Sequence, residues 1–167
     1  MIIKDIQLTN FGKFHHKSMS LKPGLNIIYG ENEAGKTTLH TFIRGMLFGI
    51  EKQRGMASGK DLYSKYEPWD TPSEYQGMMR IENNGITYRI ERNFSRQYKS
   101  LKVIDEDSGR ELTQKEIDDL FMGLDEKCYY NTISISQLGS VTDKELEVIL
   151  KNYPANLGAT KSMEIDI

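Results

Sequence analysis

The spacing of apolar and polar residues changes along the 167-residue chain, and each spacing predicts a different element. Residues 2–9 alternate between apolar and polar side chains, as a half-buried strand does, and a second strand is expected near residues 14–21. The short apolar run at 25–29 is typical of a strand buried on both faces. From Lys36 the apolar side chains recur at helical spacing, and Gly49 is the expected end of this helix.

Residues 51–77 show neither the alternation of a strand nor the spacing of a helix, and they carry several glycines and prolines. We therefore expect a long surface loop there. Alternation returns at 78–82 and at 86–91. The Asn84-Gly85 pair between these two runs is a strong signal for a tight β-hairpin. The sequence therefore predicts two antiparallel strands directly after the loop.

Farther along, the pattern predicts a second hairpin and further short elements. The hairpin would join residues 101–104 to 110–112 around an acidic turn that ends in glycine. A Thr-x-x-Glu capping box opens an expected helix at 113–122, and another opens one at 142–152. Between them, residues 129–136 are rich in residue types that favour strands.

The composition fits one soluble domain and excludes several other classes. The single cysteine, Cys128, rules out an internal disulfide framework and a CxxC metal or redox site. The sequence has neither a long apolar run nor the basic and apolar parts of a signal peptide, so we expect a cytoplasmic segment without membrane contact.

The net charge of −2 hides an asymmetry along the chain. Residues 1–60 hold 9 Lys and Arg against 4 Asp and Glu, whereas the remaining residues hold 13 against 20. A basic first third indicates that an anionic partner would bind there, although an ordinary fluctuation of surface charge explains the numbers equally well.

The motif with the clearest chemistry lies between the apolar run and the helix that follows it. It matches G-x-x-x-x-G-K-[ST], a phosphate-binding loop, without deviation. Backbone N–H groups of such a loop surround phosphate oxygens, the lysine reaches the β- and γ-phosphates, and the threonine hydroxyl binds Mg²⁺. The loop therefore predicts a nucleotide and Mg²⁺ as cofactors. A guanine-specifying Asn-Lys-x-Asp motif is absent, which argues against a GTPase. The expected cofactor-binding residues are Gly30, Glu31, Asn32, Glu33, Ala34, Gly35, Lys36, Thr37 and Thr38, with Lys36 also catalytic and Thr37 also a metal ligand.

Hydrolysis needs a second acidic site, and Asp105 and Glu106 are candidates for it. They end the apolar run 101–104, as the Walker B carboxylates of P-loop enzymes end a strand. Lys102 interrupts that run, however, and a glycine turn follows at once, so we favour a hairpin turn. If the two carboxylates did bind metal, the chain would be a self-contained small P-loop nucleotide kinase or NTPase.

Several motifs together resemble the N-terminus of SMC-like ABC-type ATPases of the double-strand-break-repair class. The shared pattern is Asn10-Phe11-Gly12-Lys13 after a first strand, then residues 24–32, then residues 35–39. Residues 66–69, 75–77, 88–94 and 130–132 resemble the bacterial YhaN/SbcC-type branch more closely. Relatives often carry an arginine where this chain has Gly12. Lys13, which follows, is the candidate to contact phosphate in its place.

This resemblance covers residues 1 to about 150 and implies an α/β fold. The expected architecture is the N-terminal lobe of an ABC-type P-loop NTPase head, with a mixed sheet, antiparallel β-hairpins and flanking helices. Residues 1–150 would form this lobe, and residues 151–167 would be a tail that leads toward a missing coiled coil. Residues 133–138 resemble the Q-loop strand, which makes Gln137 the expected second catalytic residue and second metal ligand.

The resemblance also implies partners for the chain. Hydrolysis would need the protein's own C-terminal head segment and a second head, in a homodimer across ATP. The implied role is DNA repair or chromosome metabolism, with DNA and a nuclease as candidate partners. From the residues alone, a non-hydrolysing nucleotide switch remains an alternative.

Other residues have both a functional and a structural interpretation. The segment 88–102 interleaves basic and aromatic side chains and could grip a nucleic-acid backbone, although we favour the exposed face of a hairpin. Tyr66 and Trp69 could stack on adenine, but aromatic side chains more often anchor a long loop. His15 and the other histidines lack metal-ligand spacing and are expected to be structural or surface residues.

Overall fold

The structure is a computed structural model that describes residues 1–52, 61–121 and 124–135. Two compact units divide the chain, Met1–Met122 and Gly123–Ile167. The second unit contributes α4 (Glu126–Thr132) to the description, and the other described helices and strands belong to the first. Within the described ranges, no helix combines the length and the apolar character that crossing a membrane requires.

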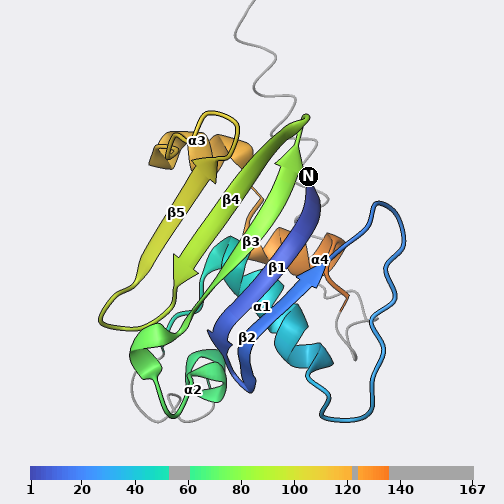
Figure 1. Ribbon diagram of the computed structural model, residues 1–167, viewed down its shortest axis with the longest axis vertical. Coiled ribbons are helices and arrows are strands. Elements are labelled where there is room, and N and C mark those ends of the chain that lie inside the picture. The colour runs from blue at the N-terminus through green and yellow to red at the C-terminus, as the bar shows by residue number, and fades with distance from the viewer. Residues whose placement is uncertain (53–60, 122–123, 136–167) are drawn as a thin grey trace, which may run out of the picture. The chain divides into compact units, whose positions relative to one another are not determined.

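The first unit is built on a five-stranded sheet with flanking helices (Figure 1). Neighbouring strands are antiparallel throughout, in the spatial order β2-β1-β3-β4-β5. The α/β class with hairpins and helices is thus confirmed, whereas the described sheet is antiparallel rather than mixed. The strands are β1 (Ile2–Phe11), β2 (Phe14–Ser20), β3 (Gln76–Asn83), β4 (Ile86–Asn93) and β5 (Ser100–Asp105). The helices are α1 (Lys36–Phe48), α2 (Leu62–Tyr66), the 3₁₀-helix η2 (Pro72–Glu74) and α3 (Gln114–Leu120).

Strands β3 and β4 form the hairpin that the Asn-Gly pair predicted. Asn83 pairs with Ile86, and both residues of the turn have a positive φ, 51° at Asn84 and 81° at Gly85. Two left-handed residues make a type I′ turn, whose twist matches that of the flanking strands. The second predicted hairpin is also present, because the chain after β5 folds back through a bridge between residues 104 and 111.

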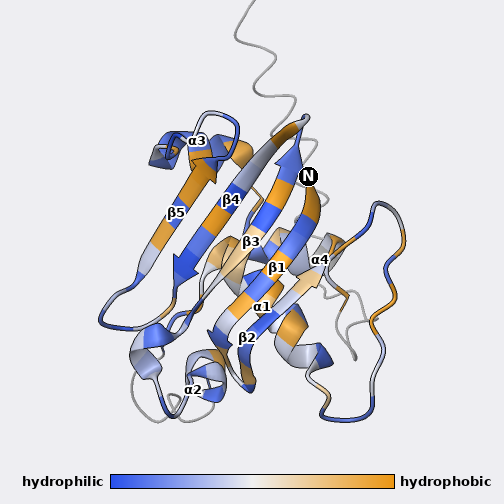
Figure 2. Cartoon of the chain, in the orientation of Figure 1, coloured by the Kyte–Doolittle hydropathy of each residue, from blue (hydrophilic) through white to orange (hydrophobic). Residues whose placement is uncertain are grey.

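One face of the sheet carries the core. Alternating hydropathy along the strands (Figure 2) places this face against α1, which packs on β1, β3 and β4. Helix α1 ends at Gly49, as predicted. The buried apolar side chains of the sheet and the helix include Ile6, Leu8, Phe11, Met79, Ile81, Ile90, Val103, Leu39, Phe42 and Met46.

Phe11, at the end of β1, lies at the centre of an aromatic cluster. Its ring centroid is 5.2 Å from those of Phe42 and Tyr75 and 5.4 Å from those of Tyr66 and Phe94. Edge-to-face, tilted and stacked pairs at these distances add to the free energy gained by burial. The partners come from α1, α2, the chain before β3 and the chain after β4, so the cluster joins four segments at one point.

The stretch expected to be a long loop is partly helical and well anchored. Asp61 caps α2, because its carboxylate accepts the Ser64 N–H at 2.7 Å. Tyr63 and Tyr66 of this helix are buried, as is Tyr75 before β3. Tyr66 thus anchors the loop, as we favoured, whereas the same expectation is wrong for Trp69, which is 95% exposed. Residues 53–60 lie outside the described part of the chain.

The strand predicted at residues 25–29 is wrong. Within the described residues this segment joins no β-ladder, and Leu25, Ile27 and Tyr29 are 88%, 82% and 93% exposed. A strand buried on both faces needs neighbours for its backbone and for its side chains. The described part of the chain supplies neither, so the segment is extended and uncovered.

The strand predicted at 129–136 is also wrong in its described part. Residues 126–132 form α4, and the Asp125 carboxylate caps it by accepting the Cys128 N–H at 2.6 Å. This cap starts a helix where residue propensity alone favoured a strand. The helix expected at 142–152 lies outside the described residues.

Arg92 of β4 ties the sheet to the C-terminal end of α1. Its Nε donates to the Met46 carbonyl at 3.1 Å and its Nη2 to the Leu47 carbonyl at 3.3 Å. Burial lowers the pKa of Arg92 to about 10, so the side chain is still charged at neutral pH. A half-buried cation here satisfies carbonyls that a helix end leaves open and interacts favourably with the helix dipole.

We expect Arg92→Met to lower the free energy of unfolding by about 1–3 kcal/mol, because buried carbonyls at the end of α1 lose their donors. The matched change Arg89→Met removes exposed ion pairs to Glu91 and Glu106 and should cost less than about 1 kcal/mol. Urea unfolding of both variants measures the difference. An equal loss of unfolding free energy in the two variants would contradict the role assigned to Arg92.

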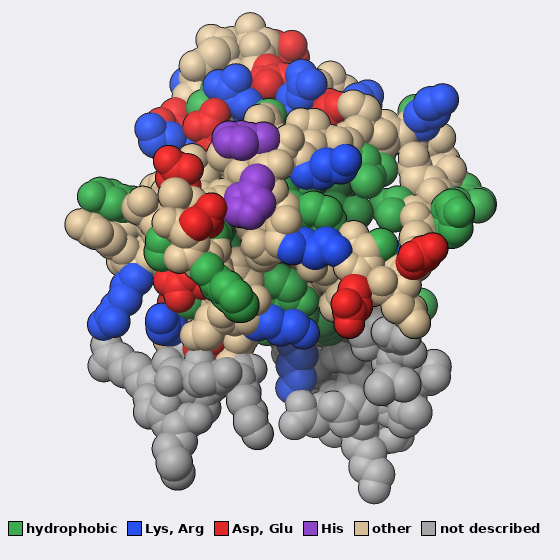
Figure 3. All heavy atoms as spheres, turned by 60° about the horizontal axis from the view of Figure 1, so that its bottom comes forward, with side chains coloured by type: hydrophobic (Ala, Val, Ile, Leu, Met, Phe, Trp, Pro, Cys, Tyr) green, Lys and Arg blue, Asp and Glu red, His purple; other side chains and the backbone are tan. Residues whose placement is uncertain are grey.

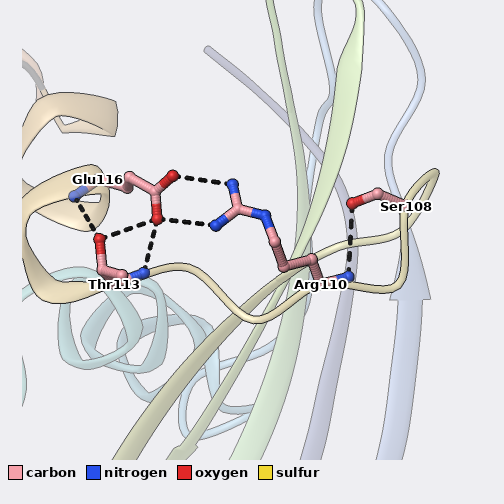
Figure 4. Close-up of polar contacts among 4 residues, drawn as sticks. All are labelled: Ser108, Arg110, Thr113 and Glu116. Carbon is pink, nitrogen blue, oxygen red and sulfur yellow. Dashed lines mark hydrogen bonds and ion pairs between the residues drawn. The ribbon is translucent and has the colours of Figure 1, made fainter.

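The capping box predicted for α3 is present and is extended by an arginine (Figure 4). The Glu116 carboxylate accepts the Thr113 N–H at 2.8 Å and two Arg110 N–H groups at 3.0 and 2.8 Å. These hydrogen bonds, those of Arg110 foremost, lower the pKa of Glu116 to about 2. The start of α3 is therefore held by a carboxylate that stays ionised in acid.

Because the folded state lowers the pKa of Glu116, its contribution to stability is complete above the ordinary value of 4.5 and is lost as the pH falls from there to about 2. An NMR titration of the Glu116 carboxyl should therefore show a midpoint near 2. In Arg110→Ala the midpoint should move back toward 4.5. An unchanged midpoint in that variant would exclude the arginine as the main cause.

Candidate functional site

The segment before the predicted phosphate loop runs outward beyond the β2 edge of the sheet (Figure 1). The phosphate loop follows this segment and leads into the first turn of α1. Gly35 is the N-cap of α1, with φ 104° and ψ 15°, a left-handed conformation that glycine adopts easily. Gly35 has no side chain to cap the helix, and the first turn holds no acidic residue. The N–H groups of this turn and the helix dipole therefore favour an anion at this end of α1.

The Lys36 side chain folds back across the loop. Its ammonium group donates to the Gly30 carbonyl at 2.6 Å and to the Glu31 carbonyl at 2.8 Å. The loop is tightly closed, because a Cβ at Gly30 would lie 2.9 Å from the Cβ of Ala34. The structure therefore brings together the glycines, the lysine and the helix end that the motif predicted.

The turn between β1 and β2 packs against the phosphate loop. The Lys13 ammonium donates to the Glu33 carbonyl, so the lysine predicted to contact phosphate lies at the loop. A Cβ at Gly35 would collide with the Phe14 ring, which explains why this position needs glycine. Sequence analysis missed Phe14, because its partner lies far away along the chain and no motif contains the pair.

Glu33 is an unusual residue for its backbone conformation. Its φ is 65°, in the left-handed region that residues with a Cβ rarely adopt. Such a conformation costs about 1–2 kcal/mol for a non-glycine residue. Strain of this kind is often concentrated in binding loops, and here it turns the Glu33 carbonyl to the Lys13 ammonium.

The two threonines of the motif differ in their environment. Thr37 is exposed in the first turn of α1. Thr38 is buried and contacts the β1–β2 turn, since a Cβ at Gly12 would lie 3.1 Å from its Cγ2. Gln137, the expected second metal ligand, lies outside the described residues, as does the tail at 151–167.

The carboxylates of Asp105 and Glu106 are engaged elsewhere. Asp105 accepts the N–H groups of Asp107 at 2.9 Å and Ser108 at 3.2 Å, and its hydrogen bonds from Ser108 lower its pKa. The Glu106 carboxylate forms ion pairs with Arg80 of β3, at 3.7 Å from Nη1, and with Arg89 of β4, at 3.9 Å from Nη1. Strand β5, which Asp105 ends, forms the sheet edge opposite β2. These contacts fit a hairpin turn and argue against a Walker B site.

The basic and aromatic side chains of residues 88–102 are divided between the core and a cleft that Arg89 and Lys102 line together with Glu91. Arg92 and Phe94 belong to the buried side, whereas Arg89 and Lys99 are held in ion pairs with glutamates. A nucleic-acid groove needs unpaired cations beside exposed aromatic rings. The structure therefore supports the structural interpretation of this segment.

The two aromatic residues considered for base stacking have opposite environments. Tyr66 is 4% exposed and stacks on Phe11, so neither face of its ring is open in the way a base requires. Trp69 is 95% exposed. One of the two candidates is therefore a core residue and the other is available at the surface.

A glycine-rich loop between an extended segment and an amphipathic helix, with a lysine folded over it, defines a P-loop nucleotide-binding domain. The chain belongs to the AAA domain family, whose pattern matches residues 5–154. The match covers most of the chain and includes the loop, the sheet and α1.

Relatives of known name extend this assignment. The chain is 31% identical over 163 residues to the DNA double-strand break repair Rad50 ATPase of Sulfolobus acidocaldarius, an alignment that covers 92% of the chain and 17% of the relative. It is 35% identical over 82 residues to the uncharacterized protein YhaN of Bacillus subtilis, covering 48% of the chain and 7% of YhaN. It is 29% identical over 104 residues to the DNA replication and repair protein RecF of Bacillus mycoides, covering 62% of the chain and 26% of RecF.

These comparisons confirm the resemblance to SMC-like repair ATPases and support an ATP-binding head domain. The chain spans only 17% of the Rad50 relative, 7% of YhaN and 26% of RecF. The similarity therefore concerns the part of each relative that this chain covers.

Replacing Glu33 by glycine should raise the free energy of unfolding by about 0.5–1 kcal/mol, because relief of the left-handed conformation outweighs the greater freedom of glycine in the unfolded chain. Glu33→Ala removes the same charge but keeps a Cβ, and it should give no gain. Chemical unfolding of the two variants separates backbone strain from charge. Equal gains in both would show that the carboxylate, and not the backbone, is the cause.

Proposed function

We propose that this chain is the ATP–Mg²⁺-binding N-terminal half of an SMC-like ATPase head. The single observation that carries the proposal is the closed loop at the start of α1, with the Lys36 ammonium folded over it. A helix N-terminus and a lysine together match the charge of a polyphosphate. The similarity to Rad50 and RecF supports ATP as the nucleotide.

Each residue of the loop has a distinct part in this proposal. The backbone N–H groups of residues 30–38 would hold the phosphates, and Lys36 would exchange the carbonyls of Gly30 and Glu31 for β- and γ-phosphate oxygens. The exposed Thr37 hydroxyl would ligate Mg²⁺ together with Gln137. Bound Mg²⁺ neutralises charge on the phosphates. Lys13 would approach the same phosphates from the β1–β2 turn.

Hydrolysis, in this proposal, depends on more than the lobe at residues 1–150. The uncovered apolar segment at 25–29 supports this idea, because it precedes the loop directly and has no partner strand in the described residues. The protein's own C-terminal head segment would cover it and supply the missing acidic site. Residues 151–167 would lead toward the coiled coil that separates the two segments.

The proposed biological role follows from the relatives. A second head would bind across ATP in a homodimer, and head engagement would act on DNA and on a nuclease partner in repair or chromosome metabolism. The names of the Rad50 and RecF relatives, which are repair proteins, support this role.

We expect the isolated chain to bind ATP–Mg²⁺ weakly and to hydrolyse it very slowly or not at all. Lys36→Ala should weaken binding at least about tenfold, because the loop loses its only cationic side chain. Titration with a fluorescent ATP analogue measures affinity, and phosphate release measures turnover. Lys102→Ala, an exposed lysine on β5, is the matched control and should bind like the wild type.

Two outcomes would overturn parts of the proposal. Robust turnover by the isolated chain that Lys36→Ala abolishes would show a complete active site rather than half of one. A loss of Mg²⁺-dependent affinity in Asp105→Asn would restore the self-contained NTPase as the better account. If the completed head binds ATP but does not hydrolyse it, the chain belongs to a nucleotide switch.

A further inference from the structure

A cleft of about 510 Å³ opens beside the phosphate loop. Its walls come from the β1–β2 turn, from the first turn of α1, and from α2 with the loop that follows. The residues that the argument uses are Gly12, Lys13, His15, Thr38, Tyr66 and Trp69. On this end of the molecule, basic, acidic and histidine side chains lie around hydrophobic ones (Figure 3). A cleft of this size suits a nucleoside.

The inner wall of the cleft is rigid. The Gly12 N–H donates to the Tyr66 carbonyl at 2.8 Å, which joins the β1–β2 turn to α2. The Tyr66 ring is fixed against Phe11 in the aromatic cluster, and Thr38 is buried beside Gly12. A ligand in this cleft would therefore meet a surface that the core already holds in place.

Trp69, the single tryptophan of the chain, stands at the mouth of this cleft. Its side chain is 95% exposed, and within the described residues it has no recorded hydrogen bond or ring contact. Pro68, directly before it, is fully buried and fixes the backbone. A large aromatic ring on a fixed backbone, open on both faces, is suited to stacking on a planar ligand.

The cleft is continuous with the phosphate loop. Thr38, the residue directly after the loop motif, lines the cleft, and so does Lys13, whose ammonium donates to the Glu33 carbonyl. Two other clefts, of about 450 and 500 Å³, are lined by residues outside the loop. A nucleotide whose phosphates are bound by the loop can therefore place its nucleoside in this cleft, which we call the Trp69 cleft.

We infer that this cleft is the nucleoside subsite and that the Trp69 indole stacks on the base. The inference rests on the proposed nucleotide function and adds a base-binding residue to it. Stacking on an aromatic ring accepts any base, so Trp69 supplies affinity rather than a choice of base.

Inorganic tripolyphosphate separates the base from the phosphates, because it fills the loop and leaves the Trp69 cleft empty. ATP–Mg²⁺ should quench Trp69 fluorescence in the wild-type chain, and tripolyphosphate should not. Trp69→Ala should weaken ATP binding by about 5- to 150-fold, the range of one aromatic–base stack, and leave tripolyphosphate affinity unchanged. Trp69→Phe should keep most of the ATP affinity. Calorimetric titration of both ligands gives these affinities.

Tyr98→Ala is the matched control, because Tyr98 is an exposed aromatic residue outside the cleft and should not affect either ligand. Equal binding of ATP by Trp69→Ala and the wild type would overturn the subsite while leaving the phosphate loop intact. Parallel losses of ATP and tripolyphosphate in Trp69→Ala would also overturn it. Failure of the wild type to bind either ligand would instead overturn the proposed nucleotide function, and the subsite with it.

Discussion

The packing of four aromatic rings around Phe11 is the contact on which the rest of the lobe depends. It brings the end of β1, the middle of α1, α2 and the chain on both sides of the β3–β4 hairpin to one point. None of these segments is long enough to be stable alone. The same cluster fixes Tyr66, whose carbonyl holds the β1–β2 turn over the phosphate loop. The geometry of a polar, exposed loop is thus determined by an apolar cluster behind it.

Helix α1 is held at both ends by different forces. At its C-terminal end the Arg92 guanidinium binds two carbonyls, and at its N-terminal end Phe14 packs over Gly35. The sheet provides both contacts, from β4 and from the start of β2. Because the helix cannot slide along the sheet without breaking one of them, its first turn keeps a fixed position relative to the cleft at Trp69.

Local signals in the sequence were sufficient where a few neighbouring residues decide the conformation. The Asn84-Gly85 turn, the phosphate loop and the Thr113 capping box are of this kind, and each was predicted from its motif. The strand predicted at 25–29 failed because burial of a strand depends on partners that the segment itself does not encode. Tyr66 and Trp69 were candidates for base stacking, but the cleft itself could not be predicted, since its walls come from segments far apart along the chain.

The uncovered segment at 25–29 also affects the solubility of the lobe. It is uncharged, rich in β-branched and aromatic residues, and open along its backbone, which is the composition of an aggregation-prone stretch. In the proposed head, the segment that covers residues 25–29 would also protect the lobe from aggregation. Without such a cover, an apolar and β-prone segment is exposed directly before the phosphate loop.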